Sequence, residues 1–278
     1  MQELDYQDFL KNMGIEKGDI IDVASDLMSI WKYCRKEGVA FEPNHLLDSL
    51  QDMVGENGTI MIRAFSWDFC KGENFDIQNS PSRVGALGNI ALKRKDFKRT
   101  QHPIYSWLVW GKYQNELCSM ENINSFGDDT PFDFLYSHQG KLLCIGNMVA
   151  DGLTHIHQAE KWANVRYRKE KEFKGVYIGN DRSEEYKTYS MFVRPLNYEV
   201  KMLSPEGYYS DWKKQNIMLS QMYNGALSCE CFDIRRIVNY ALKDFKENEG
   251  KKMVSINGQI GMEDFTEWEL LDFGIDKK

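Results

Sequence analysis

Three polar side chains near the middle of the chain have types and spacings that suit proton transfer or metal binding. His155 and His157 stand two residues apart, as on one face of an extended segment, and His157 and Glu160 stand three apart, as on one face of a helix. Imidazole exchanges protons near neutral pH, and imidazole and carboxylate groups both ligate metals. These three residues are therefore the first candidates for a catalytic or metal-binding site.

A junction between a strand and a helix would satisfy both spacings. Residues 140–146 are short, apolar and bounded by glycines, which predicts a buried strand that delivers the cluster to the edge of a sheet. In open α/β sheets, ligands bind at that edge. We therefore expect residues 151–168 to form part of a binding site.

Composition disfavours several classes of partner. The net charge of −7 opposes nonspecific binding to nucleic acid and to anionic membranes. No apolar run is long enough to cross a bilayer, and the first residues lack the basic and apolar regions of a signal peptide. We expect a cytoplasmic protein with no nucleic-acid or membrane partner. The six cysteines are scattered, so free thiols are expected.

The amino-terminal part alternates between strand and helix patterns. Residues 20–24 predict a strand, and Ser25 or Asp26 can cap a helix that follows it. Residues 45–54 have helical periodicity, and residues 59–62 predict the next strand. This alternation indicates an α/β fold, and the turn after the first strand can present backbone N–H groups to an anion.

A further helix is expected to begin at Ser80. Ser80 is a plausible N-cap and Pro81 suits the first helical position. Gly85 and Gly88 would let another backbone, or a narrow ligand, approach this helix closely. Close packing on a sheet and ligand binding both remain open.

Two antiparallel strands are expected later, at residues 175–179 and 186–194. They would form a small β subregion at residues 172–200. Neither an internal repeat nor a low-complexity linker divides the sequence, so we expect a single domain over residues 1–278.

The remaining elements are less regular. Thr130 and Pro131 predict the start of a short helix, and residues 234–245 predict a strongly amphipathic one. Residues 208–223 are interpreted as mostly helix or loop. The apolar side chains of the tail, such as Trp268, indicate that it packs against the rest.

Taken together and in order, several stretches resemble the aminoglycoside 3-N-acetyltransferase family, also called the antibiotic N-acetyltransferase family. Each match is weak alone, whereas the ordered set is specific. The matching pieces are Val23–Leu27, Gly58–Met61, Phe65–Asp68, Ser80–Gly88, His102–Pro103 with Ser106 and Gly111, Phe126–Gly127 with Pro131–Phe132, Gly140–Lys141 with Gly146, and Thr154 with His157, Glu160, Tyr167 and Arg168.

The resemblance implies direct acyl transfer from coenzyme A to an amine. It implies an α/β fold with a mixed central sheet flanked by helices, His157 as the catalytic base and Glu160 as its partner. The chemistry agrees, because a sugar amine must lose a proton before it attacks a thioester, and a histidine can take that proton. A carboxylate three residues on can orient the imidazole and stabilise the imidazolium.

For the acyl-CoA donor, the resemblance points to three parts of the chain. These are the turn after the first strand, the glycine-bearing segment that begins at Ser80, and the stretch after His102. The donor-binding residues expected on this basis are Ser25, Ser80, Ser82, Arg83, Val84, Gly85, Ala86, His102 and Ser106.

The sequence departs from the family at four positions. Family members often have histidine where this chain has Ala24, serine where it has Asp26, and proline where it has Arg63. His155 stands where an apolar residue is common, and we interpret it as a neighbour of the base or a contact to the acceptor. Because of Ala24 and Asp26, the turn after the first strand, which is expected to bind the donor, should differ in shape from that of other family members.

The same residues leave two alternatives to an acyltransferase. A zinc hydrolase would use the histidines and Glu160 as ligands, but the helical two-histidine signature and a further ligand cluster are missing from the sequence, so no metal is expected. The other alternative is a non-catalytic protein, such as a module that binds coenzyme A or assists assembly, in which these are satisfied polar groups.

The resemblance implies an amino sugar as the acceptor. A nucleotide-linked one, carrying dTDP or UDP and serving surface-polysaccharide synthesis, is preferred because arginines and aromatic residues suit a diphosphate and a base. An aminoglycoside antibiotic is the alternative. The acyl group is acetyl or hydroxyacyl, and the sequence leaves a homodimer open. The substrate-binding candidates are Arg63, Trp67, Asp68, His155 and Arg168.

Overall fold

The computed structural model describes residues 2–146, 152–203, 205–224, 227–263 and 265. Among these residues, a seven-stranded mixed sheet has the order β10-β11-β6-β1-β2-β5-β4. Its three central strands β6, β1 and β2 are parallel, and the flanking strands are antiparallel. The strands are β1 (Ile20–Ser25), β2 (Thr59–Arg63), β4 (Lys98–Arg99), β5 (Trp107–Gly111), β6 (Lys141–Ile145), β10 (Met218–Asn224) and β11 (Leu227–Asp233).

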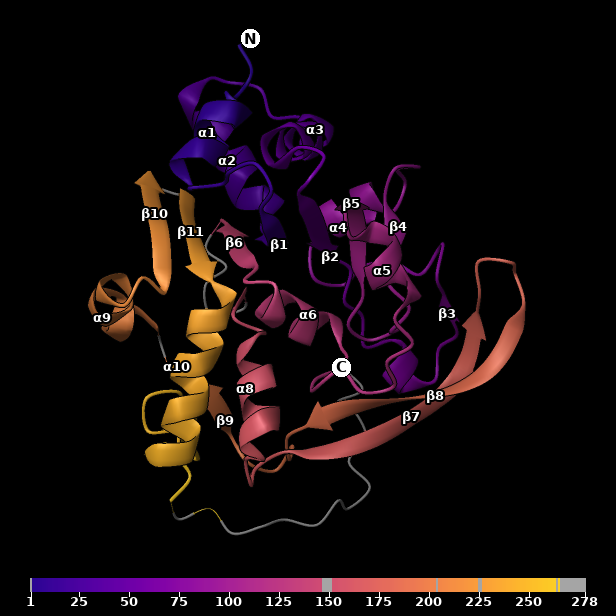
Figure 1. Cartoon of the computed structure of the whole chain (residues 1–278), viewed down its shortest axis with the longest axis vertical. Coiled ribbons are helices and arrows are strands. Elements are labelled where there is room, and N and C mark those ends of the chain that lie inside the picture. Colours follow the sequence, from indigo (N-terminus) through magenta and orange to yellow (C-terminus); the bar gives the residue numbers. More distant parts are fainter. Residues whose placement is uncertain (1, 147–151, 204, 225–226, 264, 266–278) are drawn as a thin grey trace.

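Helices cover both faces of this sheet (Figure 1). The expected α/β fold with a mixed central sheet is confirmed. The helices are α1 (Tyr6–Asn12), α2 (Leu27–Glu37), α3 (Pro43–Val54), α4 (Ala86–Ala91), α5 (Gln114–Ser119), α6 (Pro131–Ser137), α8 (Ile156–Ala163), α9 (Tyr209–Lys214) and α10 (Ile234–Glu247), with 3₁₀ turns η1 (Phe69–Lys71) and η2 (Pro205–Tyr208).

Strand β1 is buried along its whole length because both of its faces are covered. Ile21 and Val23 belong to the core under α1 to α4, whereas Ile20 and Ala24 belong to the core under α6, α8 and α10. Asp22 shares the second face, since side chains alternate along a strand. A carboxylate is thereby placed inside an apolar layer.

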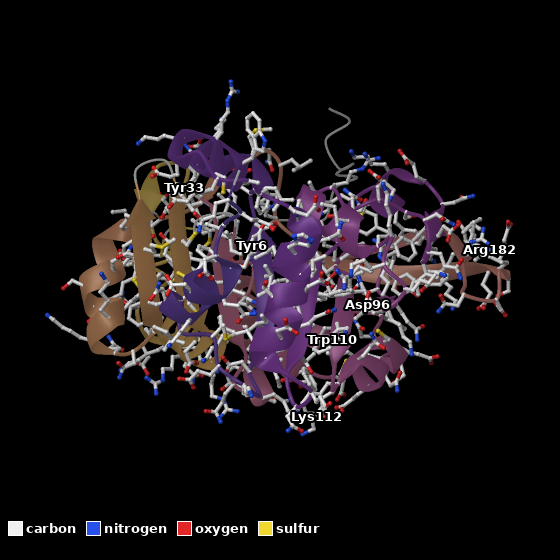
Figure 2. The ribbon with its side chains drawn as sticks, turned by 90° about the horizontal axis from the view of Figure 1, so that it is seen from above. Tyr6, Tyr33, Asp96, Trp110, Lys112 and Arg182 are labelled. Carbon is white, nitrogen blue, oxygen red and sulfur yellow. The ribbon has the colours of Figure 1, made fainter. Side chains whose placement is uncertain are left out.

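The small β subregion expected at residues 172–200 contains a long hairpin, which runs from Lys169 to Val193. Strands β7 (Lys169–Ile178) and β8 (Glu184–Val193) pair antiparallel, and β3 (Phe75–Asp76) joins β7. The hairpin projects from the body, with Arg182 at its far tip (Figure 2). A further sheet contains β9 (Val200–Met202), β12 (Val254–Ile256) and β13 (Gln259–Ile260).

The helix expected to begin at Ser80 was predicted wrongly, because α4 begins at Ala86. The Ser80 hydroxyl accepts a hydrogen bond from the backbone of Asp76, and the Asn89 side chain bridges the backbone N–H and C=O of Ser82. These side-chain bonds hold residues 80–85 in a non-helical path.

Residues 208–223 were predicted only in part. Helix α9 is present, but β10 follows it and pairs with β11 at the edge of the main sheet. A register shift between Met218 and Ser220 interrupts the alternation that would have marked a strand. Helices α6 and α10 begin where expected. Trp268 and the rest of the tail lie outside the described residues.

Gly88 should be intolerant of a side chain, although it lies in a helix. A Cβ there would stand 2.3 Å from the carbonyl oxygen of Arg63 on β2. We expect Gly88→Ala to lower the free energy of unfolding by about 1–3 kcal/mol through overpacking, even though alanine favours helices. Chemical denaturation measures this, with Gly207→Ala on η2, which meets open space, as the control. Equal stability of both variants would contradict this packing.

Candidate active site

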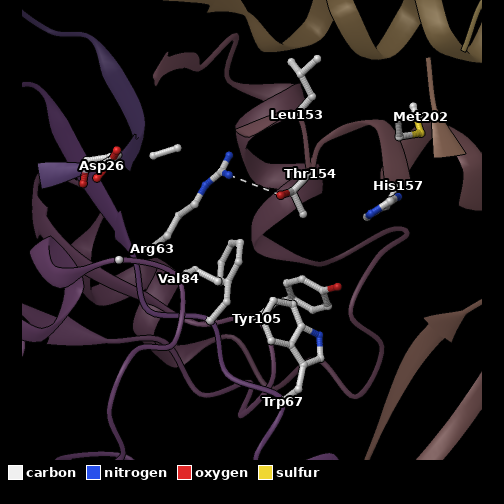
Figure 3. Close-up of a pocket in the computed structure, with 13 residues that line it drawn as sticks. Asp26, Arg63, Trp67, Val84, Tyr105, Leu153, Thr154, His157 and Met202 are labelled. Carbon is white, nitrogen blue, oxygen red and sulfur yellow. Dashed lines mark hydrogen bonds between the residues drawn. The ribbon is translucent and has the colours of Figure 1, made fainter. Parts of the chain in front are cut away.

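A cavity of about 550 Å³ opens where the parallel strands β1 and β2 end. This is the sheet edge at which the sequence predicted ligand binding. Arg63, Thr154 and His157 approach it from β2 and from the start of α8 (Figure 3). The lining residues are Ala24, Ser25, Asp26, Arg63, Phe65, Trp67, Val84, Gly85, Tyr105, Leu153, Thr154, His157 and Met202.

His157 and Glu160 form a hydrogen-bonded pair on α8. His157 Nδ1 lies 2.5 Å from Glu160 Oε2, which is the contact expected of residues three apart on a helix. The His157 side chain is 23% exposed and lines the cavity, whereas Glu160 is fully buried. With Nδ1 committed to the carboxylate, Nε2 is the ring nitrogen left for a ligand.

Glu160 is held by two further partners. Tyr167 Oη donates to its Oε1 at 2.6 Å, and Arg168 Nε lies 2.6 Å from its Oε2. Burial alone would raise the pKa of Glu160, but Arg168, His157 and Tyr167 together lower it to about 2. The carboxylate is therefore ionised at neutral pH.

His157 is poised in the neutral form. Burial lowers the pKa of His157 from its ordinary value, the nearby Arg168 lowers it further, and Glu160 opposes both effects. A neutral ring donates Nδ1–H to Glu160 and presents an unprotonated Nε2, a tautomer assigned from the hydrogen bond. This arrangement can accept a proton from a ligand in the cavity.

Arg168 has a different place from the one expected of a substrate ligand. It is absent from the cavity lining, and its guanidinium pairs with Glu160 and donates to the carbonyl of Phe192. Arg168 therefore contacts the carboxylate of the His157–Glu160 pair and not the cavity.

His155 also lies outside the cavity. Its side chain is fully buried, and its Nε2 lies 2.8 Å from Asp22 Oδ2. Arg63 does line the cavity, but it too pairs with Asp22. Asp22 was missed by the sequence reasoning, although a carboxylate inside a strand expected to be buried was an available signal.

The residues expected to hold the donor divide into three groups. Ser25, Val84 and Gly85 line the cavity, and Ala86 lines an adjoining one of about 380 Å³ that shares Ser25 and Gly85. Ser82 is buried, and its hydroxyl accepts from the backbone N–H of Val84. These five expected donor residues therefore lie close together in the structure.

Ser80, Arg83 and Asp68 line a separate surface hollow of about 270 Å³. There, Arg83 Nε donates to Asp68 Oδ2 at 2.7 Å. Trp67 instead lines the main cavity beside Tyr105, with the two rings meeting edge to face. The expected substrate pair Trp67 and Asp68 is therefore divided between the two hollows.

His102 and Ser106 belong to the protein core and are absent from the cavity lining. His102 Nε2 donates to the carbonyl of Ile123, and burial lowers the pKa of His102 to about 4. The Ser106 hydroxyl donates to the carbonyl of Ala64 and accepts from Arg99. Both side chains are satisfied within the fold.

The two histidines do not converge on a common point, since His155 faces Asp22 and His157 faces Glu160. Among the described residues, no group of three or more histidine, cysteine, aspartate or glutamate side chains is placed to hold a metal ion. In the same part of the chain, no helix is long and apolar enough to span a membrane.

An α/β sheet with a carboxylate-oriented histidine at the edge where such sheets bind ligands is an arrangement suited to general-base catalysis by an enzyme. The family model described as aminoglycoside 3-N-acetyltransferase matches residues 23–246. The chain belongs to this family and is a CoA-dependent N-acyltransferase.

Similar proteins agree with this assignment. The SPbeta prophage-derived aminoglycoside N(3')-acetyltransferase-like protein YokD of Bacillus subtilis (strain 168) is 25% identical over 268 residues, covering 88% of this chain and 92% of YokD. Sisomicin-bound AAC-VIa superimposes with a TM-score of 0.70 at 19% identity, covering 88% and 98% of the two chains. AAC-IIIb in a binary complex with CoASH gives 0.70 at 18% identity, covering 89% and 97%.

Replacing Arg168 should change the titration of His157. We expect Arg168→Met to raise the pKa of His157, because a positive charge that opposes its protonation is removed. An NMR pH titration of the His157 ring measures the shift. Arg166→Met is the matched control, since Arg166 pairs with Glu249 at the surface. A His157 pKa that falls or stays constant in Arg168→Met would contradict this electrostatic account.

Proposed function

We propose that the protein transfers an acyl group, acetyl in the simplest case, from acyl-CoA directly to an amine of an aminoglycoside-type amino sugar. The observation that carries the proposal is the His157–Glu160 pair, whose ring nitrogen Nε2 is available on the wall of the cavity. Direct transfer needs a base and no protein nucleophile.

His157 performs the proton transfers in this proposal. An ammonium ion has no lone pair, so the amine attacks the thioester carbon in its neutral form, and Nε2 takes one proton from the nitrogen as the new bond forms. Glu160, 2.5 Å from Nδ1, stabilises the imidazolium that forms. The same nitrogen then returns a proton to the departing thiolate.

The donor is proposed to lie between the ends of β1 and β2 and the start of α4. Gly85 lines both the main and the adjoining cavity, and a Cβ there would stand 3.0 Å from the carbonyl oxygen of Ser25, so the missing side chain leaves room at this point. The adjoining cavity continues past Met28 and Trp31, whose side chains are partly exposed. The apolar side chains of this lining suit the slender pantetheine arm.

The relatives support an aminoglycoside acceptor. YokD carries the name of an aminoglycoside acetyltransferase-like protein, and AAC-VIa is known with sisomicin bound. The expected preference for a nucleotide-linked sugar finds no support among these proteins. We therefore rank the aminoglycoside first.

A nucleotide-linked amino sugar stays as the second candidate because of the composition of the cavity. Its described lining includes the Arg63 guanidinium and the rings of Trp67 and Tyr105. Asp26 is the one carboxylate among the described lining residues, and its oxygens already accept hydrogen bonds from α2. A polycation therefore meets little uncommitted negative charge in this described lining.

His157→Gln should abolish most turnover and leave donor binding intact. We expect kcat to fall by about 10²–10⁴-fold, the usual contribution of general base catalysis. Steady-state thiol release measures kcat, and calorimetry measures coenzyme A affinity. The control is His45→Gln, which replaces an exposed histidine bonded to Glu3. A folded His157→Gln protein with full activity would disprove the base assignment.

The acceptor ranking is tested with acetyl-CoA and a panel of amines. We expect acetylation of sisomicin at a higher kcat/KM than of dTDP- or UDP-linked amino deoxysugars. Mass spectrometry of the products identifies the acylated compound. Turnover confined to the nucleotide sugars would reverse the ranking and leave the proposed chemistry in place.

A further inference from the structure

A second buried ionic centre adjoins the cavity, because Arg63 belongs to both. Asp22 accepts hydrogen bonds from Arg63 Nη2 at 2.6 Å, Trp107 Nε1 at 2.9 Å and Arg63 Nε at 3.0 Å. His155 Nε2 approaches the same carboxylate at 2.8 Å. All four side chains are 5% exposed or less. Both carboxylate oxygens of Asp22 therefore accept hydrogen bonds from Arg63 and hold its guanidinium in place.

The charges in this centre balance. Burial opposes ionisation of Asp22, but Arg63 and His155 hold the pKa of Asp22 well below its usual range. Burial lowers the pKa of His155, which is consistent with a neutral ring that donates Nε2–H to Asp22. His155 Nδ1 is buried without a hydrogen-bond partner among the described residues, as fits an unprotonated nitrogen. The Arg63 cation is therefore matched by a single anion.

Arg63 also forms a hydrogen bond to a residue of the cavity wall. Its Nη1 donates to Thr154 Oγ1 at 3.3 Å, the bond drawn in Figure 3. A threonine hydroxyl has one proton and two lone pairs. Because Oγ1 accepts from Arg63, the hydroxyl proton is left to donate elsewhere, and Thr154 lines the cavity.

Thr154 is also tied to the base. The backbone N–H of His157 donates to the carbonyl of Thr154 at 3.0 Å, so the two residues are joined at the start of α8. Both side chains line the same cavity. A donor hydroxyl and an acceptor imidazole are thus presented side by side to one ligand.

We propose that the Thr154 hydroxyl donates a hydrogen bond to the thioester carbonyl oxygen, and that Arg63 is the positioning residue that keeps it in this donor orientation. As the amine nitrogen bonds to the carbonyl carbon, His157 takes the amine proton and the oxygen gains the negative charge that Thr154 stabilises. The charge then reforms the carbonyl, the carbon–sulfur bond breaks, and the thiolate takes the proton from His157. This inference rests on the proposed function.

Isotope-edited infrared spectroscopy tests the hydrogen bond without turnover. With acetyl-CoA carrying ¹³C at the thioester carbonyl, binding to the wild type is expected to lower the carbonyl frequency. Thr154→Ser should keep the shift, Thr154→Val should lose it, and Arg63→Met should reduce it. An identical frequency in the wild type and Thr154→Val would overturn the proposal. Failure of acetyl-CoA to bind, measured by calorimetry, would instead disprove the proposed function.

A double-mutant cycle tests the link between Arg63 and Thr154. With sisomicin, or the panel member that the wild type acetylates, Thr154→Val should lower kcat by about 10²-fold, as for the loss of one donor to an oxyanion. Arg63→Met should lower kcat in the wild type but cause no further loss in Thr154→Val. KM for acetyl-CoA should change little. Equal losses from Arg63→Met in both backgrounds would show that Arg63 does not act through Thr154.

Folding is controlled separately, because Arg63→Met leaves the Asp22 charge buried and unpaired. The double variant Asp22→Asn with Arg63→Met removes both charges and leaves an amide for Trp107 and His155. We expect it to melt closer to the wild type than Arg63→Met does, and to show the same reduced infrared shift. A full wild-type shift in this folded variant would also overturn the role of Arg63.

Discussion

The burial of a charged carboxylate at Glu160 constrains the rest of the site. A buried charge is strongly destabilising unless partners compensate it, and here Arg168, Tyr167 and His157 provide that compensation. Tyr167 and Arg168 reach back to α8 because the chain reverses at Asn164, which has a left-handed φ of 50°. The proposed base, His157, is thus oriented through Glu160 by a local loop that closes on its own helix.

The site contains two similar ionic centres that differ in the solvent access of their histidines. Asp22 with Arg63 and His155, and Glu160 with Arg168 and His157, each join a carboxylate, a guanidinium and an imidazole. His155 is fully buried and cannot meet a ligand itself, whereas His157 is 23% exposed and can. Solvent access, rather than residue type, separates the proposed base His157 from the buried His155.

The sequence was most informative where local patterns decide structure. Hydrophobic periodicity located the strands and helices from β1 to β2, and the spacing of His157 and Glu160 correctly indicated a shared helical face. No helix begins at Ser80, because hydrogen bonds with Asp76 and Asn89 outweigh the local preference of Ser80 for an N-cap position. The roles of His155 and Arg168 depended on side chains brought close only by folding. Met202 enters the cavity from β9, and nothing near it in the sequence marks that contact.

The hairpin of β7 and β8 has a consequence for how this enzyme can vary. Its strands are ten residues each, and its root is fixed by Arg168, which bonds to Phe192 on the opposite strand and to Glu160 beneath the base. A one-residue slip at the root would exchange the two faces of the arm. Residues added at the tip, near Arg182, would only lengthen it. Insertions at the tip of the hairpin could therefore change the outer shape of the molecule during evolution and leave the His157–Glu160 pair unchanged.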